Sequence, residues 1–174
     1  MKVIVGISGA SGVGLGVKVL KALPETVSAY AVATDHAGEV ALREQGVTLF
    51  DNADIGAPSA SGSFGMDAMI VVPCSMNTLA KIACGIADNL LTRTAAVMIK
   101  ERRRLVLAPR ELPFDPIALE NMLKLSRLGV DIAPPVLGYY SRPDSLEAME
   151  DFLIGKWLDL LKIEHNLYQR WGEA

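Results

Sequence analysis

The sequence has few of the residues from which metal sites and disulfide frameworks are built. It contains two cysteines and two histidines in 174 residues. The histidines, His36 and His165, are too scattered to suggest a metal site. Cys74 and Cys84 both lie in apolar stretches, which is typical of reduced, structural cysteines in the cytosol. We therefore expect no metal ion and a cytoplasmic protein.

Long apolar runs are also missing, although 51% of the residues are hydrophobic. No run approaches the ~20 residues that a membrane-spanning helix needs, and we expect no export signal at the N-terminus. Buried parallel strands explain the apolar content, because such strands are apolar on both faces. The net charge of -3 disfavours nucleic acid as the main partner. The length fits one domain, residues 1–174.

Short apolar segments alternate with segments of helical character along the chain. The segments predicted as strands are 2–7, 27–33, 67–72, 105–108 and 130–133. This alternation predicts an α/β protein with a doubly wound parallel sheet between two layers of helices. Residues 47–64 are instead polar and rich in glycine and serine, which indicates a functional or partner-contacting loop.

A glycine-rich turn, SGASGVGLG, follows the first predicted strand and leads into a helix. Backbone N–H groups and the helix dipole at such a turn form a cradle for an anion. The glycine spacing is not the dinucleotide fingerprint, and no Gly-Lys-Ser/Thr follows as in a P-loop. The hydroxyls of Ser8 and Ser11 suit a single phosphate, and the alternative is a structural tight turn.

Polar residues also follow the second and third predicted strands. Asp35 either binds a ribose hydroxyl, as in dinucleotide-binding proteins, or caps the next helix. Ser75, Asn77 and Thr78 stand together at a predicted helix start in the sequence PCSMNT. Since one cap does not require three polar residues, this group favours a ligand-binding role.

The stretch from Asp88 to Glu111 couples an amphipathic helix to a short strand and is rich in cations. Arg93 and Lys100 are seven residues apart, so they share a face of the helix. The strand ends in Arg110 and Glu111, at the edge where parallel sheets bind ligands. Convergence of these side chains predicts a site for an anionic substrate that also needs a proton moved. A solvated basic helix end is the alternative.

Several motifs, taken in order, resemble the UbiX family of flavin prenyltransferases. The resemblance runs from about Val3 to Trp171 and rests on GISGASG, ASGSF, DAMIVVPCSMNTLAKIACGIADNLLTR, KERRRLVLAPRELPF, ENMLKLSRLGV and the closing QRW. It implies a Rossmann-like, flavodoxin-type fold with three α/β/α layers. It also implies a homododecamer, with the last helix and tail, about 144–174, packed at subunit interfaces.

The resemblance further implies a reaction and its partners. A dimethylallyl group would pass from dimethylallyl phosphate to N5 and C6 of reduced FMN, without a metal. The prenylated FMN would then serve a UbiD-type decarboxylase.

Site residues follow from the same motifs. The residues implied for FMN are Gly9, Ala10, Ser11, Thr34, Ser75, Met76, Asn77, Thr78 and Arg110. The residues implied for the donor are Arg93, Lys100, Tyr140, Lys156 and Glu44. Catalysis would fall to Ser11 near N5, to Arg93 and Lys100, and to Glu111 as the proton carrier. Cations around a departing phosphate stabilise the charge that develops on its oxygens. Arg102, Arg103 and Arg104 remain as surface or subunit contacts.

Some positions depart from the family pattern: Ile55 stands for Trp, Leu15 for Tyr, Ala96 for Asp and Ala118 for His. The choice between dimethylallyl phosphate and pyrophosphate stays open. One alternative function is an FMN-dependent cysteine-type decarboxylase, which is similar at PCSMNT but uses a histidine that residues 47–66 lack. Another is a non-catalytic protein that binds or delivers FMN.

Overall fold

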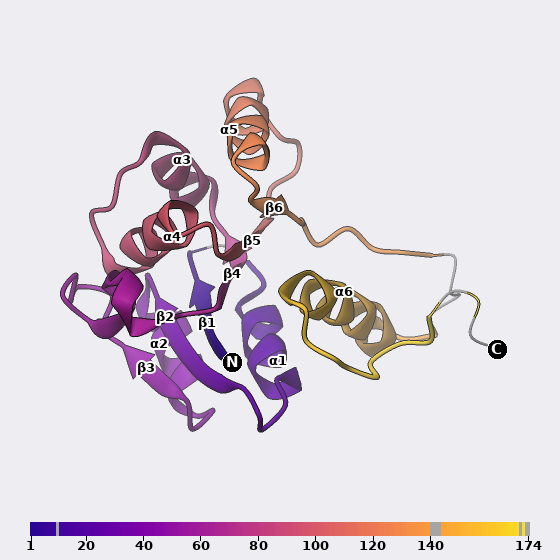
Figure 1. Cartoon of the computed structure of the whole chain (residues 1–174). Coiled ribbons are helices and arrows are strands. Elements are labelled where there is room, and N and C mark those ends of the chain that lie inside the picture. The colour runs from indigo at the N-terminus through magenta and orange to yellow at the C-terminus, as the bar shows by residue number, and fades with distance from the viewer. Residues whose placement is uncertain (10, 140–143, 171, 173–174) are drawn as a thin grey trace.

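The structure, a computed structural model, describes residues 1–9, 11–139, 144–170 and 172 (Figure 1). Within these residues one parallel sheet of six strands has the order β3-β2-β1-β4-β5-β6. The strands are β1 (Lys2–Ile7), β2 (Ser28–Ala33), β3 (Thr48–Phe50), β4 (Ala68–Cys74), β5 (Arg104–Pro109) and β6 (Asp131–Ile132). The predicted doubly wound parallel sheet is confirmed.

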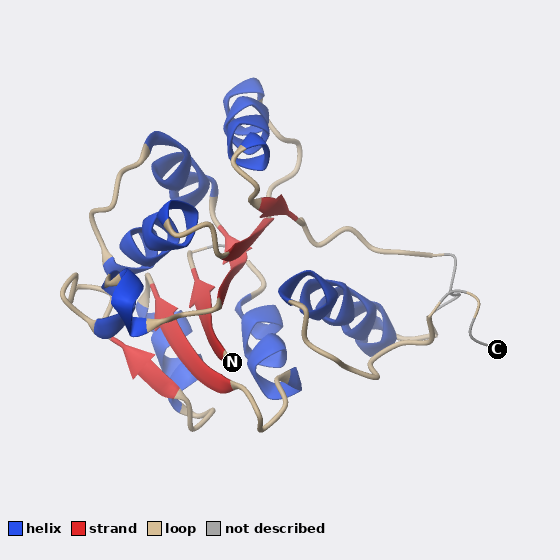
Figure 2. Ribbon diagram, viewed as in Figure 1, coloured by secondary structure: helices blue, strands red, loops and turns tan. Residues whose placement is uncertain are grey.

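Helices cover both faces of the sheet, which makes three layers (Figure 2). The helices are α1 (Val13–Ala22), α2 (His36–Arg43), α3 (Met76–Cys84), α4 (Leu90–Lys100), α5 (Pro116–Arg127) and α6 (Leu146–Leu161). Residues of α3, α4 and α5 share one hydrophobic core, and residues of α1, α2 and α6 share the other. None of the described helices is long and apolar enough to cross a membrane.

The strands alternate their side chains between these two cores. In β1, Val3, Val5 and Ile7 pack into the core under α1 and α6, whereas Ile4 packs into the core under α3 and α4. Every residue of β4 is buried. Because both faces of the sheet are covered, the central strands are apolar throughout, as expected for parallel strands.

The segment 47–64 departs from its prediction as a loop. Residues 48–50 form the edge strand β3, which pairs with β2, and two 3-10 turns follow, η1 (Pro58–Ala60) and η2 (Gly62–Phe64). The rings of Tyr30 and Phe50 stack across the two strands at 5.5 Å between centroids. A three-residue strand is too short to show alternating apolar and polar residues, so β3 forms because it packs against β2.

Glycine at position 16 lets α1 approach the sheet closely. A Cβ built on Gly16 would lie 2.5 Å from the carbonyl oxygen of Val72. On the exposed face of the same helix, a Cβ on Gly14 would have no heavy atom within 4 Å. The two glycines therefore have different roles, although they lie two residues apart.

We expect Gly16→Ala to lower the free energy of unfolding by about 2 kcal/mol, because backbone of β4 must move to admit the methyl group. The matched variant Gly14→Ala should change it by no more than about 0.5 kcal/mol, since its methyl group enters open space. Urea denaturation followed by circular dichroism measures both. Equal losses in the two variants would contradict the close approach of α1.

Candidate functional site

The loops at the carboxyl ends of the strands are joined by hydrogen bonds. The hydroxyl of Ser8, which is fully buried, accepts the N–H of Ser75 at 2.9 Å and donates to the carbonyl of Pro73 at 3.3 Å. The N–H of Gly9 donates to Oγ1 of Thr34 at 3.1 Å. The turns after β1, β2 and β4 thus meet at one edge of the sheet and form a single surface.

Ser8 and Ser11 have different environments in this turn. The hydroxyl of Ser8 is buried and engaged in the fold, so the expectation that it suits a phosphate is wrong. Ser11 is exposed and precedes Gly12, whose φ of 108° lies in the left-handed region that favours glycine. Ser11 is therefore the hydroxyl of this turn that a ligand can reach.

The first turn of α1 differs from the other helix starts. The side chains of Asp35, Ser75, Asn89, Asp115 and Ser145 cap α2 to α6. The N-cap of α1 is Gly12, which has no side chain for this purpose. In the described part of the chain, α1 alone among the α-helices begins without a side-chain cap. The N–H of Leu15 donates to the carbonyl of Gly12 at 2.9 Å, and the N–H groups of Val13 and Gly14 before it can bind acceptor atoms of a ligand.

Asp35 acts as a helix cap. Its Oδ1 accepts the N–H of Gly38 at 2.8 Å, which confirms the capping interpretation. The ribose interpretation has no support in this arrangement.

The PCSMNT turn divides between the fold and the surface. Oγ of Ser75 accepts the N–H of Thr78 at 3.2 Å and lies 3.1 Å from the Thr78 hydroxyl, so these two residues form the cap of α3. Asn77 is exposed, and Met76 is half-buried. The backbone N–H of Arg110 donates to the carbonyl of Cys74 at 3.2 Å, which brings the end of β5 beside this turn. Asn77 and Arg110 are therefore the side chains free to meet a ligand here.

The two cysteines differ, contrary to the common structural role expected of them. Burial, which outweighs hydrogen bonds involving Ser8 and Leu79, raises the pKa of the Cys74 thiol to about 12. A thiol that stays protonated near neutral pH is a poor nucleophile, so Cys74 is structural. Cys84 is exposed at the end of α3.

A basic groove runs along α4. Arg93 and Lys100 line it together with Ser61 and Gly62, and its volume is about 190 Å³. The predicted shared face of Arg93 and Lys100 is thereby confirmed. Ala96, one of the departures from the family pattern, also lines this groove, so its short side chain leaves room between the two cations.

Lys100 and the turns lie at different edges of the sheet, whereas Arg93 is in the first turn of α4, whose Leu91 packs near Gly6 of β1. Helix α4 ends at Lys100, shortly before β5 begins, whereas Arg110 and Glu111 follow the end of β5. A strand of this length spans roughly 20 Å, at about 3.3 Å per residue. The convergence expected for Lys100 with Arg110 and Glu111 is therefore not found within one chain. Glu44, the C-cap of α2 just before β3, also lies at the edge opposite Gly9.

Other predicted site residues lie elsewhere or outside the described part. Lys156 projects from α6, with its side chain 54% exposed. Glu111 is exposed, and its Oε1 accepts the N–H of Leu112 at 3.1 Å. Ala10 and Tyr140 lie outside the described residues. No cluster of three potential metal ligands occurs among the residues that the structure describes.

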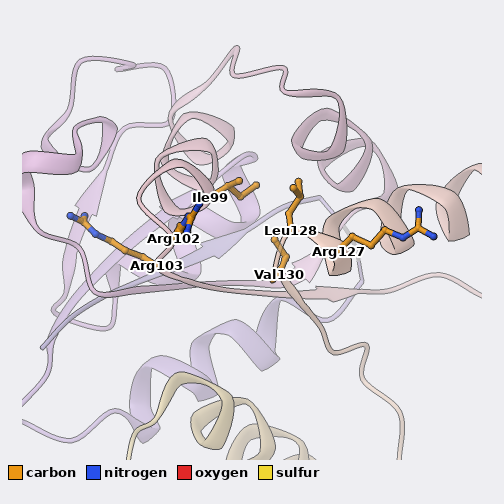
Figure 3. Close-up of a pocket in the computed structure, with 7 residues that line it drawn as sticks. Ile99, Arg102, Arg103, Arg127, Leu128 and Val130 are labelled. Atoms are coloured by element: carbon orange, nitrogen blue, oxygen red, sulfur yellow. The ribbon is translucent and has the colours of Figure 1, made fainter.

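Arg103, in the basic run after α4, has a structural role. Nη2 of Arg103 donates to the carbonyl of Gly62 at 2.8 Å, so Arg103 holds the turn that lines the groove. This corrects its assignment as a surface contact. Arg102, Arg103 and Arg127 border a second cavity of about 530 Å³, where the side chains of Arg103 and Arg127 point away from each other (Figure 3). Their guanidinium groups do not converge on one anion.

A parallel sheet with an open helix start after β1 is typical of nucleotide-binding α/β proteins. The family model described as Flavoprotein matches residues 1–156. The fold and the match together define the class of this chain as a flavoprotein.

More similar proteins narrow this class. The flavin prenyltransferase UbiX of Helicobacter pylori is 46% identical over 99% of both chains. The solved structure of AnUbiX in complex with FMN and dimethylallyl pyrophosphate is 41% identical, with a TM-score of 0.94 over 98% of this chain and 97% of that one. A dodecameric FMN-dependent UbiX-like decarboxylase from Escherichia coli is 40% identical, with a TM-score of 0.94 over 98% and 99%. The chain belongs to the UbiX family of flavin prenyltransferases.

We expect Ser8→Ala to lower the free energy of unfolding by about 1–3 kcal/mol, because it leaves the buried carbonyl of Pro73 without a donor and the half-buried N–H of Ser75 without an acceptor. Ser11→Ala, which removes the same hydroxyl from an exposed position, should change it by less than about 0.5 kcal/mol. Chemical denaturation of the two variants checks this difference. A stable Ser8→Ala variant would refute the structural role of the buried hydroxyl.

Proposed function

We propose that the protein transfers a dimethylallyl group from dimethylallyl phosphate to N5 and C6 of reduced FMN. The observation that carries this proposal is the pairing of an uncapped helix start, at α1, with a basic groove that holds Arg93 and Lys100. The first feature suits a flavin and the second suits a phosphate. AnUbiX, a relative of this chain, binds both FMN and dimethylallyl pyrophosphate.

The residues at the carboxyl edge fit FMN. The free N–H groups of α1 and the exposed hydroxyl of Ser11 offer donors to the flavin ring. Gly9 and Thr34, which are joined by a hydrogen bond, and the exposed Asn77 border the same surface. Arg110 adds a positive charge for the phosphate of FMN. Ala10 and Met76 complete the proposed set, together with Ser75 and Thr78, whose side chains also form the cap of α3.

The donor requires cations that stabilise its leaving group. Breaking the bond between the allyl carbon and the phosphate oxygen places negative charge on the phosphate. Arg93 offers a bidentate grip and Lys100 a compact charge, and we assign Tyr140, Lys156 and Glu44 to the same donor site. Reduced FMN supplies the two nucleophilic atoms. The released phosphate would take the proton that N5 loses. The bond to C6 would use the double bond of the transferred group, which gains a proton as C6 loses one, and the exposed Glu111 would carry this proton.

These two groups of residues meet only when copies of the chain meet. Lys100 and the carboxyl edge lie at opposite ends of β5, so we propose that a site that needs both Lys100 and Arg110 is built between subunits. Helix α5 offers a surface for assembly, because Ile117, Leu119, Leu123 and Leu128 are all exposed. The Escherichia coli relative is dodecameric, and we propose a homododecamer here.

We expect only some of the last helix and tail, about 144–174, to contact other subunits. The apolar face of α6 is buried within its own chain, where Trp157 is 1% exposed. Leu146, at the start of α6, is exposed and free for a subunit contact. We propose that this end of α6 and the tail contact neighbouring subunits.

The product would pass to a UbiD-type decarboxylase, and we place the reaction in the cytoplasm. Both cysteines are free thiols, which suits a reducing compartment. The alternative of a cysteine-type decarboxylase is not favoured, because residues 47–66 contain no histidine.

The proposed reaction is tested by incubating the protein anaerobically with reduced FMN and dimethylallyl phosphate. We expect the mass of the flavin to increase by one dimethylallyl unit, as measured by mass spectrometry after release. Dimethylallyl pyrophosphate in a parallel reaction shows which donor is used. An unchanged flavin with both donors would exclude prenyl transfer and leave a protein that binds or delivers FMN.

The role of the groove is tested by Lys100→Ala, which should lower kcat by about 100-fold or more, while FMN binding persists. Arg104→Ala, which removes an exposed cation outside the groove, is the matched control and should keep full activity. Coexpression of Lys100→Ala with Glu111→Gln chains should restore part of the activity, because mixed subunits contain sites with both residues intact. The absence of any recovery would argue against a site built between copies.

A further inference from the structure

The chain after α6 folds back onto that helix at a glycine. Gly155 is buried in the middle of α6, where glycine weakens a helix. A Cβ built on Gly155 would lie 2.5 Å from Cε1 of Tyr168 and 2.6 Å from Cε1 of His165. The rings of these two residues are 5.2 Å apart between centroids. Glycine at this position therefore provides a notch into which the tail segment 165–170 docks.

One carboxylate on the same helix binds this tail segment. The hydroxyl of Tyr168 donates to Oδ2 of Asp159 at 2.5 Å, and Nη2 of Arg170 donates to Oδ1 at 2.8 Å. Nε2 of His165, whose side chain is 2% exposed, lies 3.3 Å from Oδ1. Three side chains of the tail thus share the two oxygens of Asp159.

The charge of Asp159 is stable near neutral pH. Desolvation raises the pKa of its carboxyl group, but hydrogen bonds from Arg170 and Tyr168, with the charges of Arg170 and His165, outweigh it and lower the pKa to about 2. Protonation could loosen these bonds only when the pH falls toward that value, because a group with a depressed pKa contributes stability above its unfolded pKa.

The same carboxylate also faces a residue of the proposed donor site. Lys156 lies one turn earlier on α6, and its Nζ is 3.9 Å from Oδ2 of Asp159. This separation is longer than a hydrogen bond, so the ammonium group is drawn toward the carboxylate while its donors remain free. An exposed pair of this kind contributes little to stability. Its effect is on where the ammonium group lies.

We infer that Asp159 is a positioning residue. It holds the ammonium group of Lys156 in place for the donor phosphate, and it binds the tail segment 165–170 to α6 next to Lys156. This inference rests on the proposed function, because it assigns Lys156 to the donor. In the absence of Asp159, Lys156 samples more rotamers and the tail leaves α6. The donor then binds less tightly, while FMN binds as before.

Asp159→Asn removes the charge, and Gly155→Ala displaces the tail without changing any charge. Both variants should raise KM for the prenyl donor, by up to about fivefold in Asp159→Asn, with a smaller change in kcat and unchanged FMN affinity. Asp159→Glu keeps the carboxylate and should recover part of the loss. Asp151→Asn neutralises a half-buried carboxylate earlier on α6 and is the matched control. It should behave as the wild type.

Limited trypsin digestion gives a readout that does not depend on activity. Lys162 is exposed immediately before the tail, so release of the tail should accelerate cleavage after it in Asp159→Asn and Gly155→Ala. A lower or unchanged KM in Asp159→Asn, with FMN bound, would overturn the positioning role. If Asp159→Asn does not fold, Gly155→Ala and Asp159→Glu decide the same question.

The two proposals fail in distinguishable ways. If the wild-type protein does not prenylate FMN, the proposed function fails and the assignment of Asp159 to donor binding falls with it. Accelerated cleavage after Lys162 would still support the attachment of the tail to α6. Prenylation by the wild type, together with unchanged KM and unchanged cleavage in both variants, would overturn the inference and leave the function in place.

Discussion

A buried hydroxyl, that of Ser8, holds together the edge of the sheet on which the site depends. It joins the turn after β1 to Pro73 of β4 and to Ser75 in the turn that follows, and both partners are backbone groups. Buried hydrogen bonds of this kind are costly to leave unmade, so the two turns keep a fixed separation. The open start of α1 and the cap of α3 are therefore positioned by the fold before a flavin arrives.

The sequence predicted features that depend on neighbouring residues better than features that depend on contacts between distant segments. Alternating apolar segments predicted the parallel sheet, because buried strands impose that pattern over many residues. The strand at 48–50 was not predicted, because three residues are too few to show an alternating pattern of apolar and polar side chains. Ser8 and Ser11 look alike in the sequence, and only the packing of β4 shows which hydroxyl is buried. Helical spacing placed Arg93 and Lys100 correctly on one face.

Longer-range arrangements were harder to predict. The edge at which Lys100 lies follows from the direction of α4 relative to β5, which a motif does not reveal. Asp159 was missed because its partners come from a tail that must first reverse direction. One signal was present in the sequence: a glycine in the middle of a long amphipathic helix, where only a close neighbour explains it. The glycine of α6 thus marks a contact that periodicity cannot show.

Under the proposed function, the separation of Lys100 from the carboxyl edge of the sheet has a consequence for how activity depends on protein concentration. If the proposed function holds, a single chain carries both sets of residues but does not bring Lys100 to the carboxyl edge, so an isolated subunit would bind a flavin and leave it unchanged. By mass action, the fraction of complete sites rises with the fraction of chains that have assembled. Dilution would then lower the activity without any inhibitor, and newly synthesised chains would be inactive until they assemble.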